Sequence, residues 1–242
     1  MSNPAAQEKS KLERRSSHRL FIWAALILAL CVFVGFSRTY YLHRLFGKPD
    51  LRLFLHVHGI VMTSWVVLFL VQTLLVSARK VELHRKLGFL GIAAAVLVLM
   101  FGVTATTLAA RREVVAHAPD VPIVITVLAL ELTQMLTFGG LVFAGLWLRN
   151  RPQYHKRLMV LATLCMVPNA LVRLTFWWPS FILPLVLWTL MIVSIAIADS
   201  TIHRRLHPVF AKWAPLQICL LWMAYFVGVS PVWQSFAQHA VG

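Results

Sequence analysis

The sequence predicts an all-α fold, a polytopic membrane bundle with seven transmembrane helices. Of its 242 residues, 60% are apolar and only 13% are charged, and the mean hydropathy of +0.76 is well above that of an ordinary soluble domain. A helix needs about 20 residues to cross a hydrocarbon core of roughly 30 Å. Seven apolar stretches approach or exceed that length: Leu20–Ser37, Leu53–Ala78, Leu87–Ala110, Val121–Leu148, Leu158–Trp178, Phe181–Ala198 and Ala214–Phe236.

The boundaries of these stretches also predict the domain organisation. The first stretch follows a polar, basic segment and has no clear small-residue cleavage site after it, so we expect a retained first helix. Residues 1–19 have the composition of a disordered cytoplasmic tail, and residues 20–242 form a single seven-helix domain. The fifth and sixth stretches are separated by the turn-forming Trp178-Pro179-Ser180, because one continuous helix would be far too long.

The positive charges predict how the bundle is oriented. Sixteen lysines and arginines lie in the N-terminal segment and in the second, fourth and sixth connections, whereas six lie in the alternate connections. By the positive-inside rule, the N-terminus is cytoplasmic and the C-terminus is outside. We therefore expect a multi-pass protein of a bacterial inner membrane, whose partners are the lipid bilayer and, at the cytoplasmic face, anionic lipid headgroups.

Several function classes are excluded by composition and motifs. The net charge of +15 is concentrated in alternate loops rather than along a soluble face, so nucleic acid is not an expected partner. The three cysteines lie in separate spans without CxxC or CxxCH spacing, which excludes a zinc finger and covalent haem attachment. Because the chain has no HExxH, GxSxG or P-loop motif, protease, hydrolase and ATPase activities lack their residues.

One short phrase occurs three times at the edge of an apolar stretch. The copies are His84-Arg85-Lys86-Leu87, His155-Lys156-Arg157-Leu158 and His203-Arg204-Arg205-Leu206. The first two copies suggest a weak repeat, in which helices 2 and 3 correspond to helices 4 and 5; chance similarity is the alternative. The repeat would place His58 and Glu131 at a similar depth near the outer side of the membrane.

Ionisable residues within the outer half of the bundle predict a polar cavity between spans two, four and five. A charge inside a membrane is a functional hypothesis by default, and Glu131 and Arg173 lie on neighbouring spans where they can pair. The motif His56-Val57-His58-Gly59 opens span two at the same level, and His56, His58 and Glu131 are the candidate metal ligands. In a helix only one of the two histidines can face the bundle, and Gly59 would let a flat macrocycle or another helix approach. The candidate cavity residues are Gln72, Glu131, Gln134, Asn169 and Arg173. The alternative is an ion pair that only joins two helices.

A second candidate site lies at the cytoplasmic edge. His84, Gly88 and Gly91 follow one stripe of span three, and Gln72 of span two lies in the same inner half. His155, His203, His207 and Asp199 complete this inner-edge group. Paired histidines from facing helices would make a b-type haem site, in which the adjacent arginines and lysines neutralise the propionates. The alternative is that these histidines and cations are interfacial anchors for helix ends.

Two resemblances accompany these residues. The segments FLHVHGIVMTSWVVLFLVQTLLVSARKVELHRKLGFLG, YHKRLMVLATL and LHPVF, between about Leu53 and Phe210, resemble a widespread family of uncharacterised bacterial multi-pass membrane proteins with HxHG and LHRKLG/HKRLM boxes. This resemblance implies the membrane fold but no particular activity. In having histidines at helix ends around a small bundle, the chain is also similar to transmembrane b-type cytochromes. It differs from them in that its boxes lie at membrane edges and are followed by cations.

The leading functional hypothesis is therefore a redox or electron-transfer protein that binds haem b or a transition metal and works with a quinone. In that hypothesis His56 or His58 is a ligand, Glu131 is a second ligand or proton carrier, and Arg173 is an anion partner. The competing hypothesis is a non-enzymatic membrane component, either an accessory subunit of a membrane complex or a small-solute transporter.

Overall fold

The structure, a computed structural model, describes residues 4–175 and 182–242 and confirms the all-helical membrane fold. Within these residues there is no strand, and seven helical segments are long and apolar enough to cross a membrane. The predicted turn at residues 178–180 lies outside the described residues. The elements are α1 (Pro4–Phe36), the π-helix η1 (Ser37–Tyr41), α2 (Leu53–Ser77), α3 (Val81–Val115), α4 (Val121–Trp147), α5 (Pro152–Leu164), α6 (Val167–Leu174), α7 (Ile182–His203), α8 (Pro208–Gly228) and α9 (Pro231–Val241).

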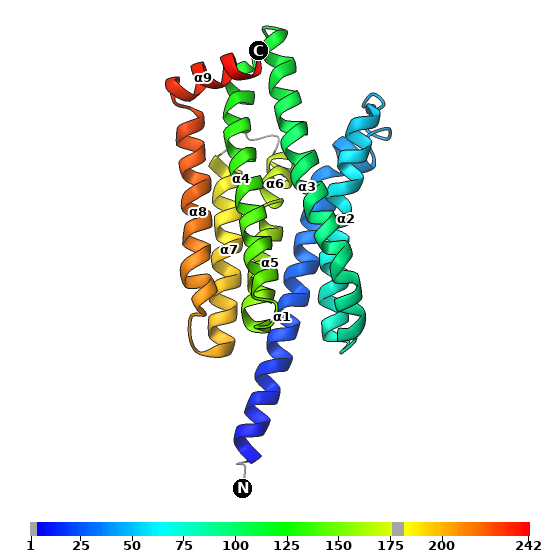
Figure 1. The fold of residues 1–242 in the computed structure, drawn as a ribbon, viewed down its shortest axis with the longest axis vertical. Coiled ribbons are helices and arrows are strands. Elements are labelled where there is room, and N and C mark those ends of the chain that lie inside the picture. The colour runs from blue at the N-terminus through cyan, green and yellow to red at the C-terminus, as the bar shows by residue number, and fades with distance from the viewer. Residues whose placement is uncertain (1–3, 176–181) are drawn as a thin grey trace.

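The helices run up and down, so that their connections alternate between two ends of the bundle (Figure 1). The N-terminal part of α1 and the connections 78–80, 148–151 and 204–207 gather at one end, which we call the basic end. The connections 42–52, 116–120 and 229–230 lie at the opposite end. The four segments with most of the cations are thus on one side, as the positive-inside argument requires. That the basic end faces the cytoplasm remains a prediction.

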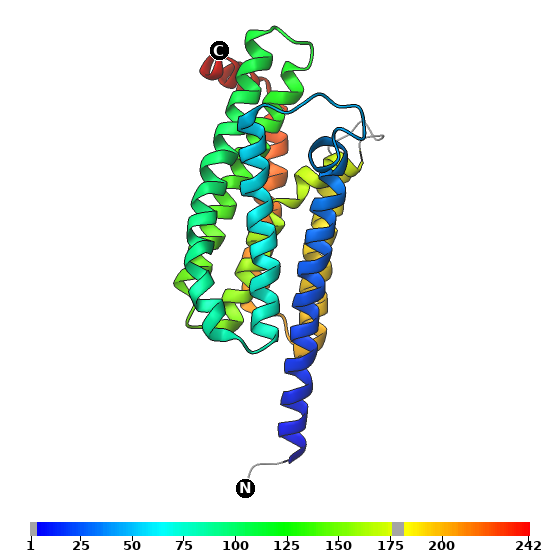
Figure 2. The same ribbon diagram turned by 90° about the vertical axis from the view of Figure 1, so that its right-hand side faces the viewer.

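The first helix is longer than its apolar stretch. Figure 2 shows α1 extending well beyond the other helices at the basic end. Residues 4–19, for which the sequence predicted a disordered tail, continue α1 as a helix rich in alanine, glutamate, lysine and arginine. These residues have high helix propensity and extend a helix whose apolar part is already fixed by packing.

The fifth span is the centre of the bundle and is broken in its middle. Within its most apolar stretch 72% of the residues are buried, against 22% in α2 and α3. The break between α5 and α6 precedes Pro168, which has no N–H to donate to the carbonyl of Leu164. The indole Nε1 of Trp188 on α7 donates to that carbonyl instead, at 2.8 Å. A side chain of a neighbouring helix therefore completes the backbone bonding of the central span.

The predicted last span was wrong at its C-terminal end. The sequence predicted one stretch to Phe236, but α8 ends at Gly228 and α9 lies across the opposite end of the bundle (Figure 1). Ser230 caps α9 by accepting the backbone N–H of Trp233, and Pro231 occupies its first turn. The Trp233 indole donates to the carbonyl of Ile125 at 3.0 Å, which fastens α9 to α4.

Candidate functional site

The predicted polar residues of spans two, four and five meet near the opposite end. The side chain of Asn169 lies beside the carboxyl group of Glu131, and Arg173 is close enough to interact electrostatically with both Glu131 and His58. Arg173 donates to the carbonyl of Asn169 at 2.7 Å, and its guanidinium lies 4.3 Å from the ring centre of Phe36. Within the described part of the chain, no direct ion pair of 4 Å or less joins Glu131 to Arg173. Three elements thus bring one carboxyl group, one guanidinium and one imidazole into a single polar cluster.

The two histidines of the HxH motif diverge, as helical geometry requires. His58 Nδ1 faces the carbonyl of Phe101 on α3 at 3.3 Å. The ring of His56 instead lies 6.1 Å from Tyr40 and 6.2 Å from His43, centre to centre. No three metal-ligating side chains of residues 4–175 and 182–242 converge on one point, so the metal set of His56, His58 and Glu131 has no support.

The glycine beside this motif is covered by an aromatic ring rather than by a cofactor. A Cβ built at Gly59 would overlap the ring of Tyr40, which comes from η1. The Tyr40 hydroxyl donates to the carbonyl of His56 at 3.1 Å, and Tyr41 hydrogen-bonds to Thr63 at 2.8 Å. The π-helix therefore holds the end of α1 against α2. The sequence pattern did not predict this contact.

The paired histidines at the basic end are brought together. The rings of His84 on α3 and His155 on α5 have their centres 6.2 Å apart and their planes 80° apart. His155 Nδ1 lies 2.8 Å from the carbonyl of Gly145. A carbonyl can only accept, so Nδ1 carries the proton and Nε2 keeps its lone pair. The Nδ1 of His84 and the Oε1 of Gln72 are buried and have no hydrogen-bond partner among the described residues.

The two remaining predicted residues differ in their surroundings. Gln134 is buried on α4 one turn after Glu131, and its Oε1 has no hydrogen-bond partner in the described part of the chain. Gln72 on α2 lies close to His84. Gln72 therefore belongs with the histidine pair at the basic end rather than with the polar cluster around Glu131.

The second box, His155-Lys156-Arg157-Leu158, makes contacts between helices inside the protein rather than contacts with lipid headgroups. Arg157 is fully buried and forms a two-pronged ion pair with Asp199 on α7, with Nε–Oδ2 at 2.9 Å and Nη2–Oδ1 at 2.7 Å. Its remaining nitrogen donates to the backbone and side-chain oxygens of Gln153. Bidentate geometry with every nitrogen bonded is the condition under which a buried ion pair is tolerated. Sequence reasoning had counted Arg157 among the loop cations.

The side chain of Lys156, in the same box, contacts α1. Its Nζ donates to the hydroxyl of Ser17 at 2.7 Å and lies 4.5 Å from the ring centre of Phe21. The ammonium group thus keeps one hydrogen bond and a cation–π contact where α1 crosses α5. Three consecutive residues of the box therefore tie α5 to α4, α7 and α1, which explains the box without a lipid.

At the basic end, His207 caps α8 and titrates abnormally. Its Nδ1 accepts the backbone N–H of Val209 at 3.2 Å, which requires a neutral ring. Burial, followed by the nearby charges of Arg157, Lys156 and Arg205 against the opposing Asp199, lowers the pKa of His207 to about 4.

This lowered pKa predicts a pH-dependent stability. In the unfolded chain a histidine has a pKa of about 6.5, so between that value and about 4 the unfolded state binds more protons. The contribution of His207 to stability is present above pH 6.5 and is lost as the pH falls toward 4. We expect unfolding titrations in mild detergent to show less loss between pH 7 and pH 5 in His207→Asn, which can still cap the helix, than in the wild type. An identical loss in both proteins would contradict the assignment.

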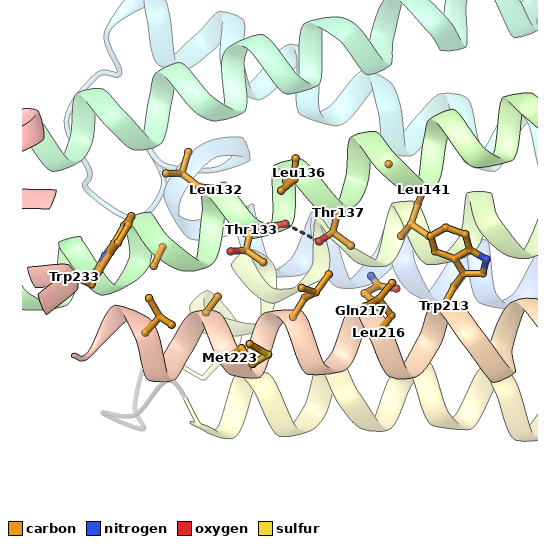
Figure 3. Close-up of a pocket in the computed structure, with 15 residues that line it drawn as sticks. Leu132, Thr133, Leu136, Thr137, Leu141, Trp213, Leu216, Gln217, Met223 and Trp233 are labelled. Carbon is orange, nitrogen blue, oxygen red and sulfur yellow. Dashed lines mark hydrogen bonds between the residues drawn. The ribbon is translucent and has the colours of Figure 1, made fainter. Parts of the chain in front are cut away.

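A groove that the sequence did not predict lies between α4 and α8 (Figure 3). It has a volume of about 450 Å³, and Trp213 and Trp233 stand at its two ends. Its polar lining consists of Thr133 and Thr137 on α4 and Gln217 on α8. The exposed side chains on its rim, among them Leu136 and Met223, show that it opens toward the lipid side of the bundle. A single glutamine within an apolar span was the only sequence signal for it.

These features define the class of the protein, an integral multi-pass membrane protein with two interior polar clusters and a lateral groove. Comparisons with known families, with curated proteins and with solved structures found no match. The resemblance in the HxHG and LHRKLG/HKRLM boxes therefore remains a prediction from the sequence.

Proposed function

We propose that the protein is a membrane redox protein that holds one b-type haem between His84 and His155. The observation that carries this proposal is the approach of the two imidazoles, 6.2 Å from centre to centre. A metal–imidazole bond is about 2 Å long, so two imidazoles on opposite sides of one metal ion have their ring centres roughly 6 Å apart. Two residues 71 positions apart in the sequence are thus close enough that one haem iron could bind both.

The proton arrangement of His155 supports the proposal. Because its Nδ1 lies against the carbonyl of Gly145, its Nε2 would be the atom that binds the haem iron. Hydrogen bonding of the far nitrogen to a backbone carbonyl is the usual way in which proteins orient a metal-bound histidine. A Cβ added at Gly145 would lie 2.9 Å from the sulfur of Met159, a flexible side chain that can move aside.

Two glycines follow His84 on α3, where a flat group could approach the helix backbone. Gly88 and Gly91 follow His84 by one and two turns, and a Cβ at Gly88 would meet nothing within 4 Å among the described residues. α2 and α4 each pack against both α3 and α5, so the two histidines lie on helices held by the same two neighbours. Arg85 is exposed at the rim, where it would bind propionates. A haem bound here would supply one-electron transfer.

Absorption spectroscopy of the purified protein, expressed with haem precursors, tests the proposal. We expect a reduced-minus-oxidised spectrum of a six-coordinate b-type haem, and about one haem per chain by the pyridine assay. His84→Ala and His155→Ala should each abolish the six-coordinate spectrum, because either change leaves one axial position without its imidazole. His56→Ala is the matched control, since His56 lies at the opposite end, and it should keep the spectrum.

The outcomes also separate this proposal from a second candidate function, a proton or small-solute path through the opposite-end cluster. Discontinuous spans and partly paired charges are typical of transporters, and here the break in the fifth span lies next to Asn169 and Arg173. A protein that takes up no haem, but whose liposomes show proton uptake that Glu131→Gln abolishes, would overturn the haem assignment in favour of that path. Glu113→Gln is the control, because Glu113 lies at the same end of the bundle but is paired with Arg112, and this variant should keep the proton uptake.

A further inference from the structure

The floor of the α4–α8 groove contains an acceptor that the protein does not satisfy. Gln217 is only 2% exposed, and its Nε2 donates to the carbonyl of Leu161 at 3.0 Å and lies 3.2 Å from the sulfur of Cys165. Since a carbonyl only accepts, these contacts fix which end of the amide is nitrogen. The Oε1 atom has no hydrogen-bond partner among the described residues.

The unpaired oxygen restricts what the groove can bind. Both polar hydrogens of the Gln217 amide are directed to protein atoms, so the side chain offers only a hydrogen-bond acceptor. A buried acceptor without a donor is unfavourable. The occupant must therefore carry a hydroxyl or another donor on an otherwise apolar body.

The depth of Gln217 restricts the occupant further. Gln217 lies nine residues after the start of α8 at Pro208, which is about 14 Å along a helix axis. That is near the middle of a hydrocarbon core of roughly 30 Å. Phospholipid donors remain at the headgroups, and an acyl chain brings no donor to this depth. The ligand must therefore be a molecule whose polar group can enter the hydrocarbon core.

The walls of the groove indicate the shape of the ligand. Trp213 lies one turn before Gln217 on α8, and Figure 3 shows its indole at the same end of the groove, where it can stack on an aromatic ring. From there Leu136 and Met223 line an apolar path toward Trp233. We propose that the groove binds a prenyl quinol, with one phenolic hydroxyl donating to Gln217 Oε1, the ring against Trp213 and the tail along α4 and α8. This site does not depend on the haem proposal.

The proposal implies that the reduced ligand binds better than the oxidised one. A quinone has carbonyls in place of hydroxyls and would leave the Gln217 oxygen unpaired. The cost of an unpaired buried group corresponds to a difference in affinity of roughly tenfold. This preference distinguishes the site from a groove that merely collects apolar molecules.

Binding of a decyl-benzoquinol and its quinone form to the purified protein in phosphatidylcholine nanodiscs, kept without oxygen, tests the site, with empty nanodiscs as the background. We expect the quinol to bind about tenfold more tightly than the quinone. Gly140→Leu fills the groove, and a Cβ at Gly140 meets nothing within 4 Å in the described part of the chain, so the fold should tolerate it while quinol binding is lost. Ala93→Leu introduces the same side chain at an exposed position of α3, outside both proposed sites, and should leave binding unchanged.

A further variant isolates the hydrogen bond. Gln217→Met keeps the shape of the side chain but removes the acceptor, and the affinities for quinol and quinone should become equal. Equal affinities in the wild type, or quinol binding that survives Gly140→Leu, would overturn the proposal.

Discussion

Asp199→Ala is expected to lower the free energy of unfolding by about 3–5 kcal/mol, the cost of leaving one member of a buried ion pair without its partner. The guanidinium of Arg157 is fully buried and loses two charge-assisted hydrogen bonds in this variant. Titration with a denaturing detergent in mild-detergent micelles, followed by tryptophan fluorescence and circular dichroism, measures the change.

Two comparisons show whether the loss comes from the unpaired charge. Arg157→Met combined with Asp199→Leu removes both charges and should recover most of the stability lost in the single variant. Asp50→Ala removes an exposed ion pair with Arg44 and should leave the unfolding transition where it is. A double variant as unstable as Asp199→Ala would show that the hydrogen-bonded pair itself, rather than the stranded charge, is needed.

The second large effect is expected where α1 and α6 touch through their backbones. A Cβ at Gly35 would lie 2.6 Å from the carbonyl oxygen and 2.8 Å from the Cβ of Ala170. These are not the ends of flexible side chains, so the helices themselves must separate to admit a larger residue. Gly35→Val should therefore lower the free energy of unfolding by about 3 kcal/mol, the upper part of the range for overpacked interiors.

The control for this prediction is the same substitution at an open glycine. Gly88→Val adds the same side chain to a helix where a Cβ has no neighbour within 4 Å among the described residues. The same detergent titration should show little change there. Equal losses at both positions would mean that valine weakens the helices in general and that the contact with Ala170 is not the cause.

Most of the fold could be predicted because it depends on properties that add up along the chain. Hydropathy found all seven spans, and the cations grouped the connections into two sets that the structure places at two ends. The histidines of the inner-edge group could also be named from the sequence, and two of them, His84 and His155, lie side by side.

What could not be predicted depends on which helices are neighbours. Arg157 has the same sequence context as the other loop cations, and only the arrangement of α5 and α7 reveals Asp199 as its partner. The HxH motif attracted attention by its residue types, yet helical geometry turns His56 and His58 to different neighbours. Gln217 was not predicted to be functional, because a single amide in an apolar span forms no recognisable motif. Its role becomes visible only when its partners on α5 are known.

The break in the fifth span has a consequence for how the chain is assembled. The chain order places α5 and α6 before α7 and α8, so the carbonyls of Leu164 and Leu161 are made before the side chains of α7 and α8 that donate to them. Trp188 supplies the first donor and Gln217 the second, each from a helix made later. The fifth span thus gains two of its hydrogen bonds only when helices that come later in the chain pack against it, so its stability in lipid is coupled to their insertion.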